Sequence, residues 1–159
     1  MKIWTSKDWE KYYNSKSHRC GLRMIYDVGT DPEVKRAINE FAIWLRAEYA
    51  FPQRVRVYLK NSERVRASDG DFVCGTCFKP YNRSDEPHIR IAVGDYPKIL
   101  SIRGKDNALA EYLWCIAHEL THYFQWLNDV KLTLAGEERQ ANRCASEILE
   151  IYSNTRDHP

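Results

Sequence analysis

The sequence lacks the features that mark several large classes of protein. It has no apolar run approaching the roughly 20 residues that span a bilayer, and no apolar segment behind Met1 that would resemble a secretion signal. Glycine and proline are scarce, at 7 and 6 of 159 residues, and no internal repeat or low-complexity tract is present. These absences argue against a membrane-spanning, collagen-like or disordered chain, and they predict a cytoplasmic location.

An excess of charge of one sign is also lacking. Lys plus Arg is 24 and Asp plus Glu is 22, so the formal net charge is +2. A chain so close to balance gives no electrostatic case for binding nucleic acid or an anionic membrane. Five cysteines cannot all pair within one chain. In a reducing compartment they are expected to be thiols or metal ligands rather than a disulfide framework.

The length of 159 residues fits one domain, which is large enough to bury a core without disulfides. The pattern predicts helices at about 6–18 and 31–49, short strands in the middle of the chain, and long helices at about 106–127 and 136–154. The predicted strands are at about 54–59, 72–78 and 88–93. The order predicts an α+β domain with helices on a short, mostly antiparallel sheet. Residues 1–30 are expected to be an N-terminal extension of a core at 31–159.

The predicted helix at 106–127 carries the motif HELTH at positions 118–122. Its four-residue spacing places the imidazoles of His118 and His122 on one helical face, and two nitrogen ligands so placed suit a tetrahedral Zn²⁺ ion. Glu119 lies about 100° around the helix from His118, where it can act as general base on a water. This is the zincin pattern HExxH, and it predicts metal-assisted hydrolysis.

A third ligand is expected on the last predicted helix, at Glu137 or Glu138. Periodicity places these two residues on opposite flanks of the apolar stripe and does not choose between them. The run from Glu138 to Asn142 resembles the gluzincin metallopeptidases, in which a Glu on the helix after HExxH opens an E-x-x-x-D/N pattern. The longer run E-x-x-A-N-R-x-A is most similar to ImmA/IrrE-like and other minimal gluzincins. The resemblance covers the last third of the chain, and it chooses Glu138.

The resemblance implies a single zincin-like domain that acts as a zinc-dependent peptidase on a peptide or protein substrate. It implies three ligands for Zn²⁺, which are His118, His122 and Glu138. It further implies that Glu119 is the general base and that Asn142 holds one histidine by its second ring nitrogen. In zincins of this kind the substrate pairs with an edge strand just before the motif helix. Residues 88–93 occupy that place here.

The residue that stabilises the oxyanion is not evident. Larger gluzincins supply it from a C-terminal subdomain, whereas only 21 residues follow Glu138. The role would fall to Tyr152, Arg143, His158 or a loop residue. This gap keeps a second hypothesis open, in which the domain binds or regulates without turnover. The net charge disfavours a third, a protease associated with nucleic acid.

The segment Cys74-Gly75-Thr76-Cys77 is a CxxC pair with three open interpretations. Two reduced thiols in a turn are the simplest. A structural zinc would need two further ligands, which Cys20 and His18 could supply. A disulfide or redox pair is the third, although redox CxxC motifs begin a helix within a βαβ pattern and the sequence predicts none here.

Overall fold

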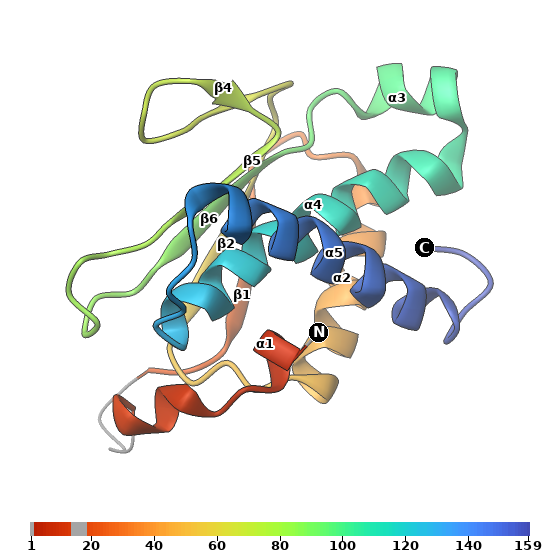
Figure 1. The fold of residues 1–159 in the computed structure, drawn as a ribbon. Helices are drawn as coiled ribbons and strands as arrows, with labels where there is room; N and C mark the ends of the chain where they lie inside the picture. Colours follow the sequence, from red (N-terminus) through yellow and green to blue (C-terminus); the bar gives the residue numbers. More distant parts are fainter. Residues whose placement is uncertain (1, 14–18) are drawn as a thin grey trace.

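A computed structural model of the chain describes residues 2–13 and 19–159 (Figure 1). In the described residues, two short helical segments, a strand and a helix are followed by a run of strands and then by the closing helices. In order, the elements are α1 (Lys2–Thr5), η1 (Asp8–Lys11), β1 (Leu22–Tyr26), α2 (Pro32–Glu48), β2 (Val55–Lys60), β3 (Val65–Arg66), β4 (Phe72–Val73), β5 (Gly75–Phe78), β6 (His88–Ala92), α3 (Tyr96–Arg103), α4 (Lys105–Leu127) and α5 (Leu134–Ser153). The mixed α and β composition expected from the sequence is confirmed.

The main sheet has four strands in the order β1-β2-β6-β5. β1 and β6 both pair in parallel with β2, and β5 alone pairs antiparallel, with β6. β1 and β2 are parallel because the crossover helix α2 carries the chain from the end of β1 back to the end of the sheet at which β1 began. The expectation of a mostly antiparallel sheet is therefore wrong. The sequence pattern predicts no strand at Leu22–Tyr26, because exposed Ile25 breaks the alternation of apolar and polar side chains.

The first 30 residues do not form an extension apart from the core. β1 is an edge strand of the main sheet, and Ile3 and Trp4 are buried. The indole Nε1 of Trp4 donates a hydrogen bond to Thr121 Oγ1 at 2.9 Å, inside the motif helix α4. The single helix predicted at about 6–18 is instead α1 followed by the short 3-10 turn η1, and positions 14–18 lie outside the described residues.

The two faces of the sheet differ. Val55, Val57 and Leu59 of β2 are fully buried, whereas the alternate residues of that strand are partly exposed. α2 and α4 pack on the buried face and against each other, and α5 lies on α4 as an outer layer (Figure 1). The motif helix is thus held between the sheet and α5. None of the helices in the described part of the chain is both long and apolar enough to cross a membrane.

The start of α5 and its short connection to α4 position the HExxH motif relative to α5. α2 begins as its sequence predicts, since Asp31 Oδ1 accepts a hydrogen bond from the backbone N–H of Glu33 at 2.8 Å. α5 begins at Leu134, where Thr133 Oγ1 accepts from the N–H of Gly136 at 3.1 Å. The short connection between α4 and α5 makes them antiparallel neighbours, so the first turns of α5 lie opposite the last turns of α4. The motif and the residues after Gly136 therefore face each other.

Candidate metal centre

Two histidines of α4 and one glutamate of α5 converge. The Nε2 atoms of His118 and His122 are 3.2 Å apart. Glu138 Oε1 lies 3.1 Å from His122 Nε2, and Glu138 Oε2 lies 3.4 Å from His118 Nε2. One potential ligand atom from each residue lies within 4.8 Å of the others. Among the described residues, this is the one group of three or more His, Cys, Asp or Glu side chains that could hold a metal ion.

The structure separates the two glutamates that periodicity left as alternatives. Glu138 faces the histidines, whereas Glu137 pairs with Lys79, with 3.1 Å between Lys79 Nζ and Glu137 Oε2. The side chains of His118 and His122 are 13% and 10% exposed, and that of Glu138 is 58% exposed. The cluster is therefore walled by the two imidazoles and opens to solvent beside Glu138.

Gln125 orients His122, a role that the sequence analysis did not assign to it. Gln125 Nε2 donates to the carbonyl of Glu137 and to Gln140 Oε1, both at 3.0 Å. This leaves Gln125 Oε1 facing His122 Nδ1 at 2.8 Å. Because an amide oxygen only accepts, Nδ1 carries the proton and Nε2 of the neutral ring presents its lone pair to the cluster. The sequence could have indicated this contact, because residues three apart on a helix are neighbours and Gln125 follows His122 by three positions.

Asn142 lies beside the other histidine, but it does not make the hydrogen bond to the second ring nitrogen that the resemblance implies. Its side chain interacts with His118 and favours the protonated ring, as Glu138 also does. These effects are outweighed, because burial and the neighbouring His122 lower the pKa of His118 below its usual 6.5. His118 Nδ1 is buried and has no partner with hydrogen-bond geometry. A neutral His118 leaves the lone pair of Nε2 free to bind a cation.

Glu119 is buried at the inner wall of the same site. Its residue exposure is 6%. Burial, with the Glu138 carboxylate as a second cause, raises the pKa of Glu119 to about 8, and Lys79 partly opposes the shift. The surroundings of this carboxyl group therefore move its proton affinity toward neutral pH.

Gly75 allows β5 to approach α4 closely at Glu119. A Cβ atom on residue 75 would lie 2.7 Å from Cys115 Sγ, 2.9 Å from Ile91 Cδ1 and 3.0 Å from Glu119 Cγ. Each of these contacts is closer than packed carbon and sulfur atoms allow. The glycine within the CxxC segment is therefore a packing requirement of the site.

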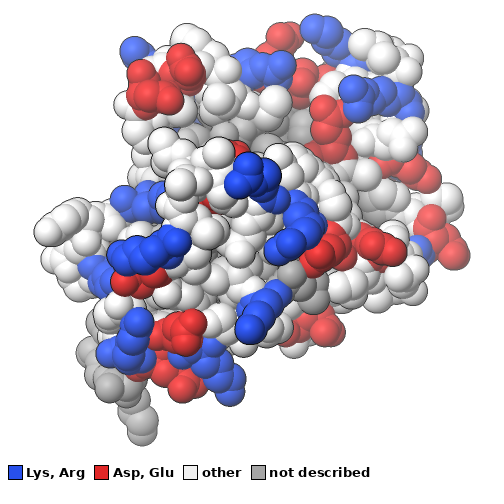
Figure 2. All heavy atoms as spheres, viewed as in Figure 1, with Lys and Arg blue, Asp and Glu red and all other residues white. Residues whose placement is uncertain are grey.

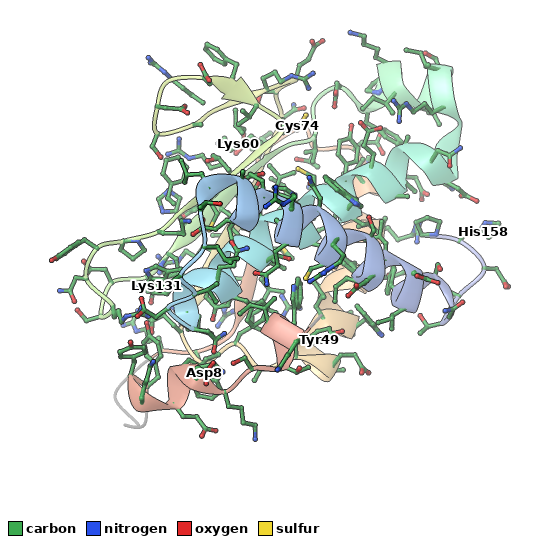
Figure 3. The ribbon with its side chains drawn as sticks, viewed as in Figure 1. Asp8, Tyr49, Lys60, Cys74, Lys131 and His158 are labelled. Atoms are coloured by element: carbon green, nitrogen blue, oxygen red, sulfur yellow. The ribbon has the colours of Figure 1, made fainter. Side chains whose placement is uncertain are left out.

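The two cysteines of the CxxC segment have different surroundings. Cys74 lies where β4 passes into β5 (Figure 3), is exposed, and accepts a hydrogen bond from Arg64 Nη1 at 3.3 Å. Burial and the Glu119 carboxylate raise the pKa of the Cys77 thiol. All five cysteines are free thiols. Neither Cys74, Cys77 nor Cys20 belongs to a group of metal-ligating side chains within 2–13 and 19–159, and His18 lies outside those ranges.

The oxyanion candidates named from the sequence do not reach the cluster. Tyr152 lies 14 positions after Glu138, about 21 Å farther along α5, and its ring packs against Phe41 of α2. His158 is in the C-terminal tail (Figure 3), 2.8 Å from Asp106 Oδ2. Arg143 is exposed and pairs with Glu147 within α5. The role suggested for Tyr152 is therefore corrected, because helix geometry takes it away from the site.

A pocket of about 430 Å³ contains the cluster. It is lined by the motif residues of α4, by β5 with the residue that follows it, and by the first turns of α5. Lys79 is the one cation among the described residues that line it. Its ammonium group donates to Glu137 and has two further N–H donors.

β5, rather than residues 88–93, is the edge of the sheet at this pocket. β6 is paired on both sides, with β2 and with β5, so the expectation that it is the edge strand is wrong. The backbone N–H of Ala92 donates to the carbonyl of Cys74 at 2.8 Å. Alternation in an antiparallel pair then turns the backbone groups of Gly75 and Cys77 away from β6, toward the free edge.

The donor set fits a zinc ion. Two imidazole nitrogens and a carboxylate converge as acceptors, and acceptors so close together repel one another unless a cation or a proton lies between them. Two histidines, one glutamate and an open side are a ligand set of catalytic zinc sites. The residues that would hold the ion are His118, His122 and Glu138.

Comparison of the chain with protein-family models, with curated proteins and with solved structures found no match. The resemblance to gluzincins therefore rests on the HExxH motif and on the run from Glu138 to Asn142. Both motifs contribute to one cluster in the structure.

Proposed function

We propose that the chain is a zinc-dependent peptidase. The observation that carries the proposal is the convergence of His118, His122 and Glu138 in a pocket where Glu119 is buried beside them. Zn²⁺ bound there would supply Lewis-acid activation of water and of the scissile carbonyl. The proposal includes that the chain forms a zincin-like catalytic domain.

Glu119 has the position required of the proton carrier. As the general base it accepts a proton from the attacking water, and it then gives that proton to the leaving amine. Its burial keeps the carboxyl group from being solvated by bulk water. Gln125 holds the ring of His122 from outside the cluster, and Asn142 lies beside His118.

The free edge of β5 is the proposed binding site for the substrate main chain. The outward N–H and C=O groups of Gly75 and Cys77 can pair with an extended peptide as an added strand. The Cβ position of Gly75 and the side chain of Cys77 face α4, because a Cβ at residue 75 would meet Glu119 and Cys115 and because alternate residues of a strand share one face. A peptide paired at this edge therefore passes along the pocket that contains the cluster.

Lys79 is proposed to stabilise negative charge on the reacting carbonyl oxygen. It lines the pocket, it is the cation that opposes the raised pKa of Glu119, and it has N–H donors to spare beyond the bond to Glu137. This assignment replaces Tyr152. A single donor of this kind contributes roughly 10²–10³ in kcat.

The test combines metal content with turnover. Zinc is measured in untagged wild type and in the double variant His118→Ala, His122→Ala, and a peptide library derived from a proteome is digested by wild type, Glu119→Gln and Glu111→Gln. We expect about one zinc per chain that is lost in the double variant. Glu119→Gln should keep the zinc and lose turnover by roughly 10² or more. Glu111→Gln, on the exposed side of the same helix, should match wild type.

The alternative is a domain that keeps the metal cluster but binds or regulates without turnover. The observation that favours it is the absence of Tyr152, Arg143 and His158 from the residues that line the pocket. One zinc per chain with no cleavage in the library supports this alternative. Zinc that survives loss of both histidines refutes both proposals.

A further inference from the structure

The outer face of the main sheet, opposite α2 and α4, carries an unusual set of side chains. Strand register aligns them in two rows across β1, β2, β6 and β5. The first row is Arg23, Arg56, His88 and Phe78, and the second is Ile25, Tyr58, Arg90 and Thr76. Every one of these eight residues is at least partly exposed. We call this surface the outer sheet face.

The charge of the outer sheet face is positive. The four strands contain Arg23, Arg56, Lys60 and Arg90, and no Asp or Glu. Glu86 pairs with Arg56 at 2.9 Å, and Asp27 pairs with Lys60 at 2.8 Å, both from outside the strands. By contrast, the face that shows α5 has basic and acidic side chains interspersed (Figure 2). The near balance of the whole chain therefore conceals a local excess of positive charge.

Like charges on this face lie directly beside one another. Arg23 and Arg56 are register partners on adjacent strands, and Arg56 is the partner of His88. Neighbouring strands are about 4.8 Å apart, so the guanidinium groups of Arg23 and Arg56 repel each other, an effect that the Glu86 carboxylate beside Arg56 reduces. Burial lowers the pKa of His88, and the charges of Arg90 and Arg56 lower it further. The arrangement would be relieved by an anion bound across the strands.

Flat rings lie among these cations. Phe78 and His88 are stacked, with centroids 4.5 Å apart and planes 15° from parallel, and the Arg90 guanidinium lies 5.0 Å from the Phe78 centroid. Tyr58 stands edge-on to His88 at 6.0 Å. Tyr58, Lys60, His88 and Arg90 line a hollow of about 570 Å³ in this face. A ligand that has a planar ring beside a negative charge could stack on these rings and pair with the cations.

We propose that the outer sheet face binds single-stranded nucleic acid. The arginines and Lys60 pair with phosphates, which gives affinity without sequence preference. Tyr58 and the Phe78–His88 stack provide planar surfaces for unpaired bases, as aromatic side chains on an open sheet do in other single-strand binders. This face is on the opposite side of the sheet from α4, so the metal cluster plays no part in the proposal.

The test measures the fluorescence anisotropy of a labelled 15-nucleotide deoxythymidine strand with the full chain at 50 and 200 mM NaCl. The outer-face variant is Arg23→Gln, Arg90→Gln, since neither arginine has an ion-pair partner among the described residues. The control is Arg139→Gln, Arg143→Gln on α5, which removes the same charge. We expect the outer-face variant to bind at least 10-fold more weakly and to reduce the salt slope by about 1–2. The control should stay within about 3-fold of wild type.

Two more variants separate stacking from charge. Tyr58→Leu keeps the charge and should weaken binding by roughly 5-fold or more, while Arg23→Lys, Arg90→Lys should retain most of the affinity. Circular dichroism and urea unfolding identify any variant that fails to fold. The proposal is overturned if wild type does not bind at 50 mM NaCl, or if both glutamine variants lose affinity equally. It is also overturned if polyglutamate or phosphatidylserine vesicles bind as tightly as the oligonucleotide, because the face would then dock an acidic protein or a membrane.

Discussion

At the scale of single residues, the burial of Glu119 carries a cost in stability. Its carboxyl group is buried beside the carboxylate of Glu138, and no basic side chain donates a hydrogen bond to it among the described residues. Burial of an ionised carboxylate without such a partner is costly, so the metal-free protein holds a proton there up to a pH near 8.

This residue makes the metal-free fold less stable as pH rises. The pKa of Glu119 is raised from 4.5 to about 8 on folding, so the folded state binds more protons than the unfolded state between these values. Stability is retained below pH 4.5 and falls as pH approaches 8. In EDTA, Glu119→Gln should therefore match wild type near pH 5 and be more stable at pH 8, on the order of 3–5 kcal/mol. Urea unfolding at several pH values measures the difference, and a difference that does not change with pH contradicts the prediction.

Gln125 is predicted to set the zinc affinity through His122. Gln125→Leu removes the acceptor for His122 Nδ1 and the donor to the Glu137 carbonyl. Loss of such an outer partner should weaken zinc binding by about 10–100-fold, measured by competition with a chelating dye. Gln125→Glu keeps an acceptor for Nδ1 and should retain most of the affinity. Equal losses in both variants would show that the bond to His122 is not the cause.

At the scale of elements, β5 and α4 are held at a distance that only glycine permits. Gly75→Ala would place a methyl group 2.7 Å from Cys115 Sγ and 3.0 Å from Glu119 Cγ. We expect a loss of about 1–3 kcal/mol in the free energy of unfolding, together with reduced turnover, because Glu119 must move. Adding Cys115→Ala removes the nearest contact and should recover part of the stability. A Gly75→Ala protein as stable as wild type would mean that β5 shifts freely.

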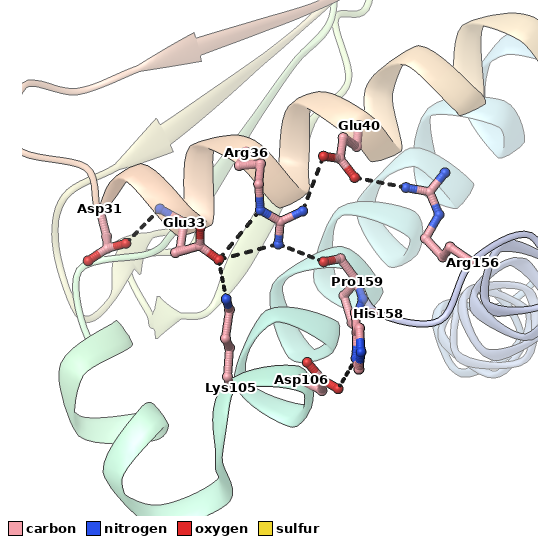
Figure 4. A network of polar contacts seen from close by, with 9 residues as sticks. All are labelled: Asp31, Glu33, Arg36, Glu40, Lys105, Asp106, Arg156, His158 and Pro159. Atoms are coloured by element: carbon pink, nitrogen blue, oxygen red, sulfur yellow. Dashed lines mark hydrogen bonds and ion pairs between the residues drawn. The ribbon is translucent and has the colours of Figure 1, made fainter.

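Polar contacts, most of them only partly buried, tie the C-terminal tail to α2 and α4 (Figure 4). Arg36 joins Glu33 and Glu40 of α2 to the carbonyl of Pro159. Exposed ion pairs contribute little to stability, whereas Phe41, on the same helix, is fully buried. Phe41→Ala should cost about 3–5 kcal/mol, and Arg36→Ala less than a third of that. Urea unfolding of both variants decides whether the network or the core holds α2 in place.

At the scale of the whole molecule, a zinc ion would add metal–ligand bonds between two layers that otherwise meet through apolar packing and a few hydrogen bonds. His118 and His122 belong to α4, and Glu138 belongs to α5. A ligand at 100 times its Kd stabilises the folded state by about 2.7 kcal/mol, which corresponds to a rise in Tm of about 5–10 °C for a chain of this length. Zinc should produce this rise in wild type and none in His118→Ala, His122→Ala. A rise of the same size in the double variant would place the metal elsewhere.

The sequence alone determined the parts whose signal is local. Helix spacing placed His118, Glu119 and His122 on one side of α4, and the apolar pattern placed an element at about 31–49, close to the bounds of α2, because both depend on neighbours within one or two turns. Alternation of apolar residues in the same way predicted β2 and β6. The HExxH pattern and the run after it were enough to predict a metal-binding cluster.

Only the tertiary structure decided the features that depend on residues far apart in the chain. It made β5 the edge strand and the sheet mostly parallel, it placed Glu137 beside Lys79, and it took Tyr152 into the core. The packing of α4 against β5 and α5 supplied Gln125, Gly75 and Lys79 to the site. It also gathered the basic side chains of separate strands on one face, which a nearly neutral composition does not reveal. These outcomes follow from strand order and helix packing, which no short stretch of sequence encodes.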